Sequence, residues 1–226
     1  MPVHTEVYNQ IISQLQPKAV QLIALSKIQS KEDIQQLYNL GQRDFGENYV
    51  QELIEKQAAL PTDINWHFIG HLQRNKVKYI APFVHLVHGV DSLALLKEIN
   101  KQAKKNDKVI NCLLQIHIAQ EETKFGMDND ELAVAIEALT APEGELRNVF
   151  VLGLMGMASF SDDTQKVRNE MKSLKSLFDK YTAVSSPNCR FTTLSMGMSG
   201  DYEMAIKEGS NMVRIGSLLF GARRKK

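Results

Sequence analysis

A lysine directly after an apolar run is the first residue of this sequence that could do chemistry. Lys27 follows residues 19–26, whose aliphatic and β-branched side chains are typical of a buried strand. Alternate residues of a strand share a face, so Ile23, Leu25 and Lys27 point the same way. Burial on that face would favour the neutral amine, which is a nucleophile toward a carbonyl carbon. The alternative is a surface lysine just past the end of a strand.

A stretch rich in glycine and serine, residues 195–201, could bind an anion. It reads Ser-Met-Gly-Met-Ser-Gly-Asp, and its glycines allow successive backbone N–H groups to converge on a phosphate. A helix that begins near Asp201 would add its positive N-terminal end. The alternative is an ordinary loop with a helix cap at Ser199 or Asp201.

Arg214 lies in the last apolar run, residues 212–215, and Gly216 and Ser217 follow it. An arginine between apolar residues needs an anionic or acceptor partner if it is buried. The backbone N–H groups of Gly216 and Ser217 could join residues 195–201 in holding a phosphate. The alternative for Arg214 is a salt bridge at the rim of the sheet.

Histidine spacing gives no metal motif. His67 and His71 lie four residues apart, but they fall on a strand and the loop after it rather than on one helix. His85 and His88 have an odd spacing, so a strand would point them to opposite faces. We therefore expect no metal site.

Eight apolar runs alternate with helix-like stretches along the chain. The runs are residues 19–26, 43–45, 65–69, 84–87, 109–118, 149–154, 191–195 and 212–215, and helices are expected at 31–40, 47–60, 73–80, 92–105, 129–139, 163–181 and 201–208. This alternation predicts parallel strands, and eight units predict an α/β fold, a closed (β/α)8 (TIM) barrel with an extra N-terminal helix. The alternative is an open doubly wound sheet. The first strand of such a sheet usually ends in a glycine-rich loop, whereas the first strand of this chain ends in Ser26-Lys27.

A closed barrel would bring the candidate residues together. Its first and last strands are neighbours, and active sites collect at the C-terminal ends of the strands. Lys27 would then face a phosphate cradle formed by residues 195–201 and 216–217. An amine beside a phosphate cradle suits a phosphorylated aldehyde held as a Schiff base, either pyridoxal phosphate or the sugar phosphate of an aldolase.

Composition indicates an ordinary globular protein. The 226 residues carry 27 Lys+Arg against 26 Asp+Glu, and this balance argues against a general nucleic-acid binder. No apolar run reaches the roughly 20 residues of a membrane span, and the N-terminus does not resemble a secretory signal. Cys112 and Cys189 lie far apart and are predicted to be free thiols in a reducing compartment. We predict one cytoplasmic domain over residues 1–226, with a solvated basic tail at 223–226.

Several segments together resemble the pyridoxal phosphate homeostasis protein family. They are residues 22–27, 45–49, 67–76, 124–126, 153–155, 195–201 and 214–216, and they occur in the order found in the family. Residues 67–76 and 195–201 are the most specific. The family is similar to the N-terminal barrel of fold-type III pyridoxal phosphate enzymes such as alanine racemase.

The resemblance implies a cofactor site. Lys27 would form the internal aldimine with pyridoxal 5'-phosphate, and Asn48 and His67 would line the ring side. Arg214 would lie beside the ring nitrogen and disfavour its protonation, because like charges repel. The residues implied around the phosphate are Ser195, Met196, Gly197, Met198, Ser199, Gly216 and Ser217.

The resemblance also implies a role in intracellular pyridoxal phosphate homeostasis and in the balance of amino and keto acids. Racemases of this fold type use a second domain that supplies an opposing acid/base, and we expect no such domain here. The expectation is therefore a monomeric cofactor-binding or carrier protein without robust turnover, whose partners are the cofactor and pyridoxal phosphate-dependent apoenzymes rather than nucleic acid or membrane. The alternatives are a Schiff-base aldolase acting on a phosphorylated sugar and a regulatory protein that uses the cofactor as a signal.

Overall fold

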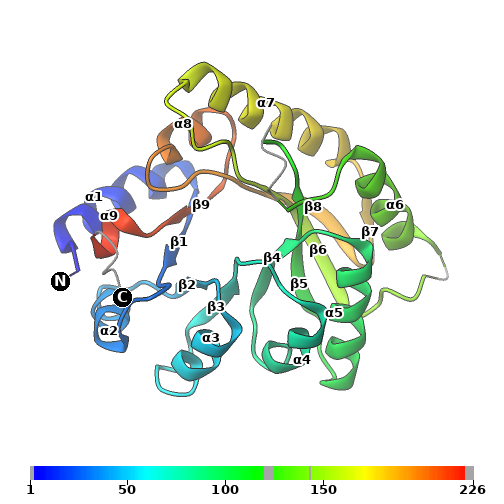
Figure 1. The fold of residues 1–226 in the computed structure, drawn as a ribbon, viewed down its shortest axis with the longest axis horizontal. Helices are drawn as coiled ribbons and strands as arrows, with labels where there is room; N and C mark the ends of the chain where they lie inside the picture. Colours follow the sequence, from blue (N-terminus) through cyan, green and yellow to red (C-terminus); the bar gives the residue numbers. More distant parts are fainter. Residues whose placement is uncertain (1–2, 120–124, 143, 222–226) are drawn as a thin grey trace.

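Eight parallel strands close into a barrel in the computed structural model, which describes residues 3–119, 125–142 and 144–221 (Figure 1). The strands are β1 (Gln21–Leu25), β2 (Asp44–Glu47), β3 (Asn65–Phe68), β4 (Leu86–Val90), β5 (Ile110–Ile116), β6 (Val149–Gly156), β8 (Cys189–Ser195) and β9 (Met212–Ile215). β1 pairs with β9 and β6 pairs with β8, which completes the ring. The predicted (β/α)8 barrel is confirmed.

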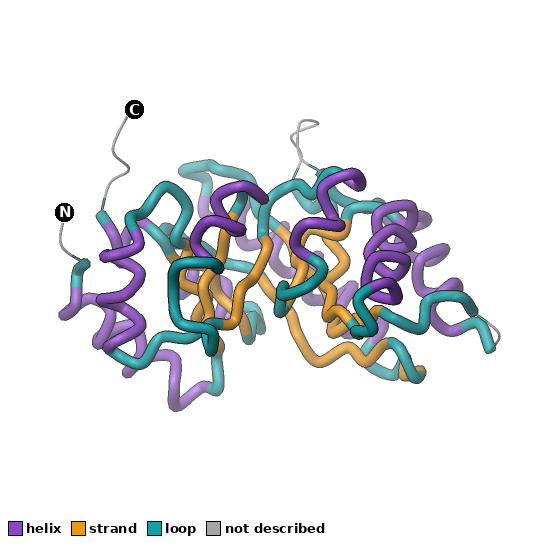
Figure 2. Tube along the Cα trace, turned by 90° about the horizontal axis from the view of Figure 1, so that it is seen from below, coloured by secondary structure: helices purple, strands orange, loops and turns teal. Residues whose placement is uncertain are grey.

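Helices surround the strands, as the side view shows (Figure 2). They are α1 (Thr5–Leu15), α2 (Lys31–Asn39), α3 (Val50–Gln57), α4 (Val77–Ile80), α5 (Leu93–Lys105), α6 (Asn129–Thr140), α7 (Thr164–Tyr181), α8 (Tyr202–Lys207) and α9 (Ser217–Phe220). α1 and α9 lie side by side, and the His4 backbone N–H donates to the Leu219 carbonyl oxygen at 2.9 Å. Within the described ranges, no helix is long and apolar enough to cross a membrane.

Short polar side chains fix where several of these helices begin. Ser30 and Ser92 each accept a hydrogen bond from a backbone N–H three residues later, at the starts of α2 and α5. Asp128 forms a capping box with Glu131 at the start of α6. Such caps satisfy N–H groups that have no partner within the helix, which is why sequence patterns located these starts well.

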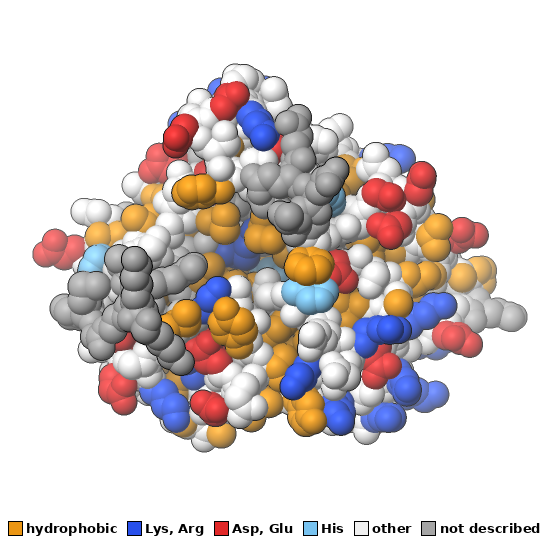
Figure 3. All heavy atoms as spheres, viewed as in Figure 1, with side chains coloured by type: hydrophobic (Ala, Val, Ile, Leu, Met, Phe, Trp, Pro, Cys, Tyr) orange, Lys and Arg blue, Asp and Glu red, His pale blue; other side chains and the backbone are white. Residues whose placement is uncertain are grey.

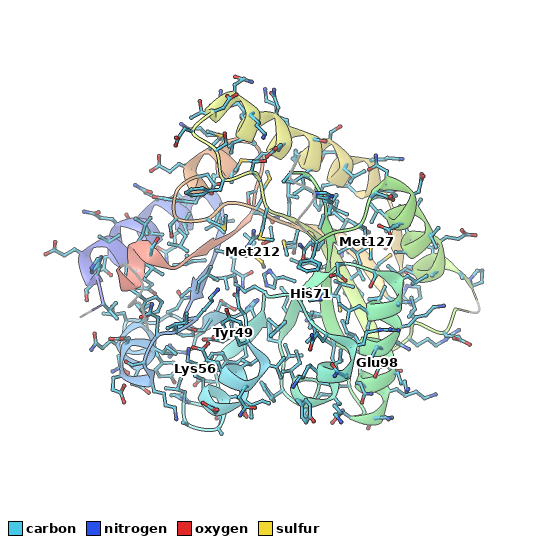
Figure 4. All side chains as sticks on the ribbon, in the orientation of Figure 1. Tyr49, Lys56, His71, Glu98, Met127 and Met212 are labelled. Carbon is cyan, nitrogen blue, oxygen red and sulfur yellow. The ribbon has the colours of Figure 1, made fainter. Side chains whose placement is uncertain are left out.

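Strand alternation separates two apolar regions. Side chains such as Phe45, Trp66 and Phe68 pack outward beneath the helices. Ile23 and Met212 belong to a second cluster inside the barrel, and Figure 4 shows Met212 near the middle of the ring of strands. Because β9 alternates, Arg214 shares the inward face with Met212.

The structure adds elements that the sequence patterns did not predict. β7 (Ser185–Ser186) pairs antiparallel with β8, and α9 follows the last barrel strand. The helix expected at 47–60 begins only at Val50, because Glu47 still pairs with Phe68 in the sheet. The helix expected at 73–80 is a 3₁₀ turn (Arg74–Lys76) followed by α4.

Candidate functional site

A cavity of about 660 Å³ opens at the C-terminal ends of the strands. Figure 3 looks onto this face, where hydrophobic side chains gather around a central hollow. Of the predicted site residues, the lining includes Lys27, Asn48, Met198, Ser199, Arg214, Gly216 and Ser217. It does not include His67, Ser195, Met196 or Gly197. The barrel therefore gathers loops after β1, β2, β8 and β9 around one cavity.

Lys27 is half-buried just beyond the end of β1. Its Nζ lies 5.1 Å from the ring centroid of Tyr49, whose exposed ring is labelled at the mouth of the barrel in Figure 4. A cation this close to an aromatic face is attracted by the ring. Lys27 thus lies between the two alternatives, since it lines the cavity and keeps one side open to solvent.

The residue before Lys27 is held by a buried ion pair. Lys56 Nζ donates to the Ser26 carbonyl oxygen at 2.6 Å and to Glu47 Oε1 at 2.7 Å. The Ser26 hydroxyl donates to the same Glu47 oxygen at 2.5 Å. The side chains of Lys56 and Glu47 are 5% and 0% exposed, so little water competes for these contacts.

The residue after Lys27 is held by the same network. Lys56 Nζ also donates to Glu52 Oε1 at 2.6 Å, and this oxygen accepts the backbone N–H of Ile28 at 2.6 Å. Ile28 has φ of +64°, a conformation that β-branched residues rarely adopt. Glu52 and Lys56 therefore fix a strained turn whose central residue is the candidate lysine.

Burial raises the pKa of Glu47 to about 7, although the Lys56 ammonium and its hydrogen bonds with Lys56 and Ser26 oppose the rise. Its second oxygen, Oε2, is buried without a hydrogen-bond partner in the described part of the chain. Sequence patterns did not predict this network. The one available signal was Glu47 itself, which belongs to the quoted segment 45–49.

The loop after β8 is folded so that its backbone faces the cavity. Gly197 has φ of +95°, and a Cβ there would lie 2.6 Å from the Cβ of Ala205, so only glycine fits without strain. The Met198 N–H donates to Asp201 Oδ1 at 2.6 Å. Ser199 Oγ accepts the Gly216 N–H at 3.2 Å and so joins the loops after β8 and β9.

These two loops leave backbone donors free at the cavity. Within the described chain, the N–H groups of Ser199, Gly200 and Ser217 have no protein acceptor, and all three residues line the cavity. Converging backbone N–H groups are a common anion site. Residues 195–201 and 216–217 are predicted from the sequence to form such a cradle, and the barrel places Lys27 in the lining of the same cavity.

Ser195 and Met196 lie beneath the cradle rather than on it. The Ser195 hydroxyl accepts Arg214 Nη1 at 2.7 Å, and its carbonyl oxygen accepts the same group at 3.0 Å. The Met196 backbone N–H donates to Ser210 Oγ, and its side chain packs in the outer core. Both residues are buried at the end of β8, where the sheet and its core occupy them.

Arg214 is 2% exposed, and its guanidinium donates hydrogen bonds to neutral oxygen atoms. Besides Ser195, its Nη2 donates to the Gly156 carbonyl oxygen at 3.0 Å. Burial lowers the pKa of Arg214 to about 10, and the nearby Asp201 carboxylate opposes the shift. The guanidinium therefore remains charged at neutral pH at the floor of the cavity, which is the acceptor-paired arrangement rather than a salt bridge at the rim.

His67 does not reach the cavity. It is fully buried inside the barrel, where Nε2 lies 3.0 Å from Asp44 Oδ1 and Nδ1 lies 2.9 Å from Nε2 of His88. Burial lowers the pKa of His67 and lowers that of His88 well below its ordinary value. Because Asp44 is the first residue of β2, the ring turns toward the other end of the barrel.

The quoted segments 67–76 and 124–126 meet at the rim. The rings of His71 and Phe125 are stacked with centroids 4.0 Å apart, and His71 Nδ1 lies 2.9 Å from Asp91 Oδ2. Lys124 and the basic tail at 223–226 lie outside the described residues.

Comparisons with known proteins agree with this geometry. The family model for the alanine racemase N-terminal domain matches residues 8–224. A pyridoxal phosphate homeostasis protein of Aquifex aeolicus (strain VF5) is 42% identical over 204 residues, covering 90% of this chain and 87% of the relative. A protein of the same name from Synechocystis sp. is 37% identical over 222 residues, covering 96% of this chain and 97% of the relative.

Solved structures give the same result. The structure of PipY from Synechococcus elongatus with pyridoxal phosphate bound is 34% identical, with a TM-score of 0.85 over 96% of this chain and 99% of that chain. Alanine racemase from Bartonella henselae is 15% identical, with a TM-score of 0.71 over 96% of this chain and 58% of the racemase chain. The second comparison supports the barrel fold alone.

Proposed function

The chain belongs to the alanine racemase N-terminal domain family and to its pyridoxal phosphate homeostasis proteins, and from this premise we propose that it binds pyridoxal 5'-phosphate and takes part in its intracellular homeostasis. One observation carries the proposal. A single cavity holds a lysine amine, Lys27, together with the unpaired backbone N–H groups of Ser199, Gly200 and Ser217. An aldehyde that carries a phosphate matches both halves of this donor set.

Lys27 supplies the covalent attachment. Bound pyridoxal phosphate brings an aldehyde whose carbon is electrophilic. The Lys27 amine is a nucleophile toward such a carbon and would hold the cofactor covalently at the cavity. Glu52 and Lys56 hold the backbone on either side, so the amine starts from one position.

The cradle holds the phosphate. The N–H groups of Ser199, Gly200 and Ser217 act as donors, and the bond between Ser199 and Gly216 keeps the two loops together. Gly197 and Met198 shape the first loop, and Ser195 and Met196 support it from below through the backbone.

The cofactor ring would occupy the cavity between Lys27 and the cradle. Asn48 and Arg214 line this cavity. Asn48 would contact the ring side, and Arg214 would lie beside the ring nitrogen. Because Arg214 stays protonated at neutral pH, it would donate a hydrogen bond to that nitrogen and disfavour a second positive charge there. His67 takes no part in these contacts, since both of its ring nitrogens are engaged inside the barrel.

The proposed role is storage and delivery without robust turnover. The relatives at 42% and 37% identity are named for homeostasis rather than for a reaction. The recipients are pyridoxal phosphate-dependent apoenzymes, and the protein acts as a cytoplasmic monomer over residues 1–226. Light scattering tests the monomer, and transfer to a colourless apoenzyme in a two-chamber dialysis cell tests delivery.

The absorption spectrum of the purified protein tests the proposal. We expect a yellow wild type that borohydride bleaches, with the added mass on the peptide that contains Lys27. Lys27→Ala removes this covalent capture, whereas Lys31→Ala, an exposed lysine at the start of α2, keeps it. A wild type that is colourless and takes up no added pyridoxal phosphate contradicts the proposal. Cleavage of sugar phosphates that depends on Lys27 would then support the aldolase alternative.

A further inference from the structure

Three side chains meet at the end of the barrel opposite Lys27. They are Asp44, the first residue of β2, His67 of β3, and His85, which directly precedes β4. We propose that these three residues form a binding site for a divalent transition metal of the zinc class. The site is separate from the proposed cofactor cavity, whose lining contains none of them.

The ligand atoms are close to coordination spacing. His67 Nε2 lies 3.0 Å from Asp44 Oδ1, and one ligand atom from each of the three residues lies within 4.8 Å of the other two. A tetrahedral zinc ion with bonds of about 2.1 Å holds its ligand atoms about 3.4 Å apart. His67 and Asp44 thus need to separate slightly. His85 is exposed, so its ring can turn inward to close the remaining distance.

Residues around the three ligands orient them. Asn65 Nδ2 donates to Asp44 Oδ1 at 3.1 Å, which fixes the carboxylate. Nδ1 of His67 lies 2.9 Å from Nε2 of His88, a fully buried histidine. A histidine that binds metal through one ring nitrogen usually donates a hydrogen bond from the other. His88 offers His67 that acceptor.

His88 allows His67 to change its tautomer when the metal binds. Nδ1 of His88 is buried and has no hydrogen-bond partner in the described part of the chain. With a proton between His67 and Asp44, His88 must donate from Nε2, so Nδ1 is left with a bare lone pair. With a metal between them, Nδ1 of His67 donates to Nε2 of His88 instead, and the His88 proton moves to Nδ1, which has no partner among the described residues in either state. The histidine pair therefore accepts the metal by a tautomer shift and without a net change in its protons.

The donor set selects the class of ion. Two imidazoles and one carboxylate suit zinc, cobalt or nickel, whereas calcium and magnesium prefer sites made of oxygen atoms alone. The exposed side of His85 leaves the fourth position to water. The metal would tie β2 and β3 to the segment before β4. Residues at this end of a TIM barrel usually serve stability, so we expect a stabilising ion.

Calorimetric titration with zinc sulfate tests the site. The tag-free, metal-stripped full chain is compared with His85→Ala and Asp44→Asn, and with His71→Ala as the matched control. His71 also pairs with an aspartate, at 2.9 Å, but it is absent from the candidate metal cluster. We expect one zinc per chain in the wild type and in His71→Ala, and at least a tenfold loss of affinity in the other two variants.

Thermal unfolding supplies a second readout. Zinc at about a hundred times its Kd should raise the Tm of the wild type by about 5 °C, and that of His85→Ala by much less. His85 is exposed, so this variant should fold normally in the absence of metal. Zinc that does not bind, or that binds His85→Ala as tightly as the wild type, overturns the proposal.

The experiment is repeated with and without pyridoxal phosphate. Equal zinc stoichiometry in both states supports a site at the opposite end from the cofactor. Zinc binding only when the cofactor is present would place the ion at the phosphate and overturn the proposal. Because pyridoxal phosphate uptake is followed by absorption in every variant, failure of the metal site and failure of the proposed function are distinguishable.

Discussion

The ammonium of Lys56 lies 2.6 Å from the backbone carbonyl oxygen of Ser26, the residue next to the proposed attachment lysine. This contact links a side chain of α3 to the turn after β1. It makes Lys56 a positioning residue for Lys27 and not a group that touches the ligand. Its partners Glu47 and Glu52 complete the support.

Replacement of Lys56 by methionine should therefore affect both stability and cofactor capture. It leaves Glu47 buried without its cation and frees the Ser26 carbonyl. Removing one partner of a buried pair costs about 3 kcal/mol, which urea unfolding will measure. The rate of covalent capture should also fall, because Lys27 starts from a wider range of positions.

Lys175→Met is the matched control for Lys56→Met. Lys175 pairs with Asp179 at 2.6 Å, but the two side chains are 35% and 52% exposed. Exposed pairs contribute at most about 1 kcal/mol. Equal losses of stability in the two variants would show that the buried network has no special role.

Glu47 should make stability depend on pH. Its folded pKa is raised from 4.5 to about 7, so between these values the folded state binds the proton more readily than the unfolded state. The contribution to the free energy of unfolding is therefore present below pH 4.5 and is lost as the pH rises through 7. Denaturant unfolding should show the free energy of unfolding falling between pH 4.5 and 8. Glu47→Gln should reduce this fall by up to about 3 kcal/mol. An unchanged slope in the variant would contradict the burial of a titrating carboxyl at this position.

Gly197→Ala should damage the phosphate cradle. The position has φ of +95°, and the new Cβ would press on Ala205 of α8. We expect a loss of about 2 kcal/mol in stability, together with weaker binding of pyridoxal phosphate. Gly200→Ala is the control in the same loop, since a Cβ there meets nothing within 4 Å. Similar effects of the two substitutions would argue against the observed loop conformation.

Ser199→Ala should weaken phosphate recognition specifically. The change removes the acceptor of the Gly216 N–H and unties the two loops of the cradle. We expect the affinity for pyridoxal phosphate to fall about tenfold, in line with one lost hydrogen bond in a buried site, and the affinity for pyridoxal to stay the same. Titration of both aldehydes, followed by absorption, measures the difference. Equal losses for both would place the phosphate elsewhere.

Local sequence patterns determined the barrel and one half of the site. Apolar runs and helix caps are set by neighbouring residues, so the eight strands could be located before their partners were known. Alternation within one strand placed Arg214 inward with Met212, and a closed barrel makes the first and last strands neighbours. These two rules predict that Lys27 and the loop at 195–201 lie close together.

Only the tertiary structure decided the contacts that cross between strands and helices. Glu47 lies in β2, Lys56 in α3 and Ser26 just after β1, and nothing in the spacing of one segment brings them together. The cluster of Asp44, His67 and His85 shows the same limit. Spacing along one strand gave no metal pair, whereas the pairing of β2 with β3 sets Gly46 opposite His67 and brings the His67 ring to Asp44.

His85 shows why strand periodicity could not predict this cluster. His85 precedes β4, so the alternation of side chains along that strand does not apply to it. The centroids of the His85 and His88 rings both lie 5.2 Å from the centroid of the His67 ring. Sequence periodicity reports which face a residue takes within its own element. The register and closure of the sheet decide which residues of other elements share that face, and these depend on packing over the whole barrel.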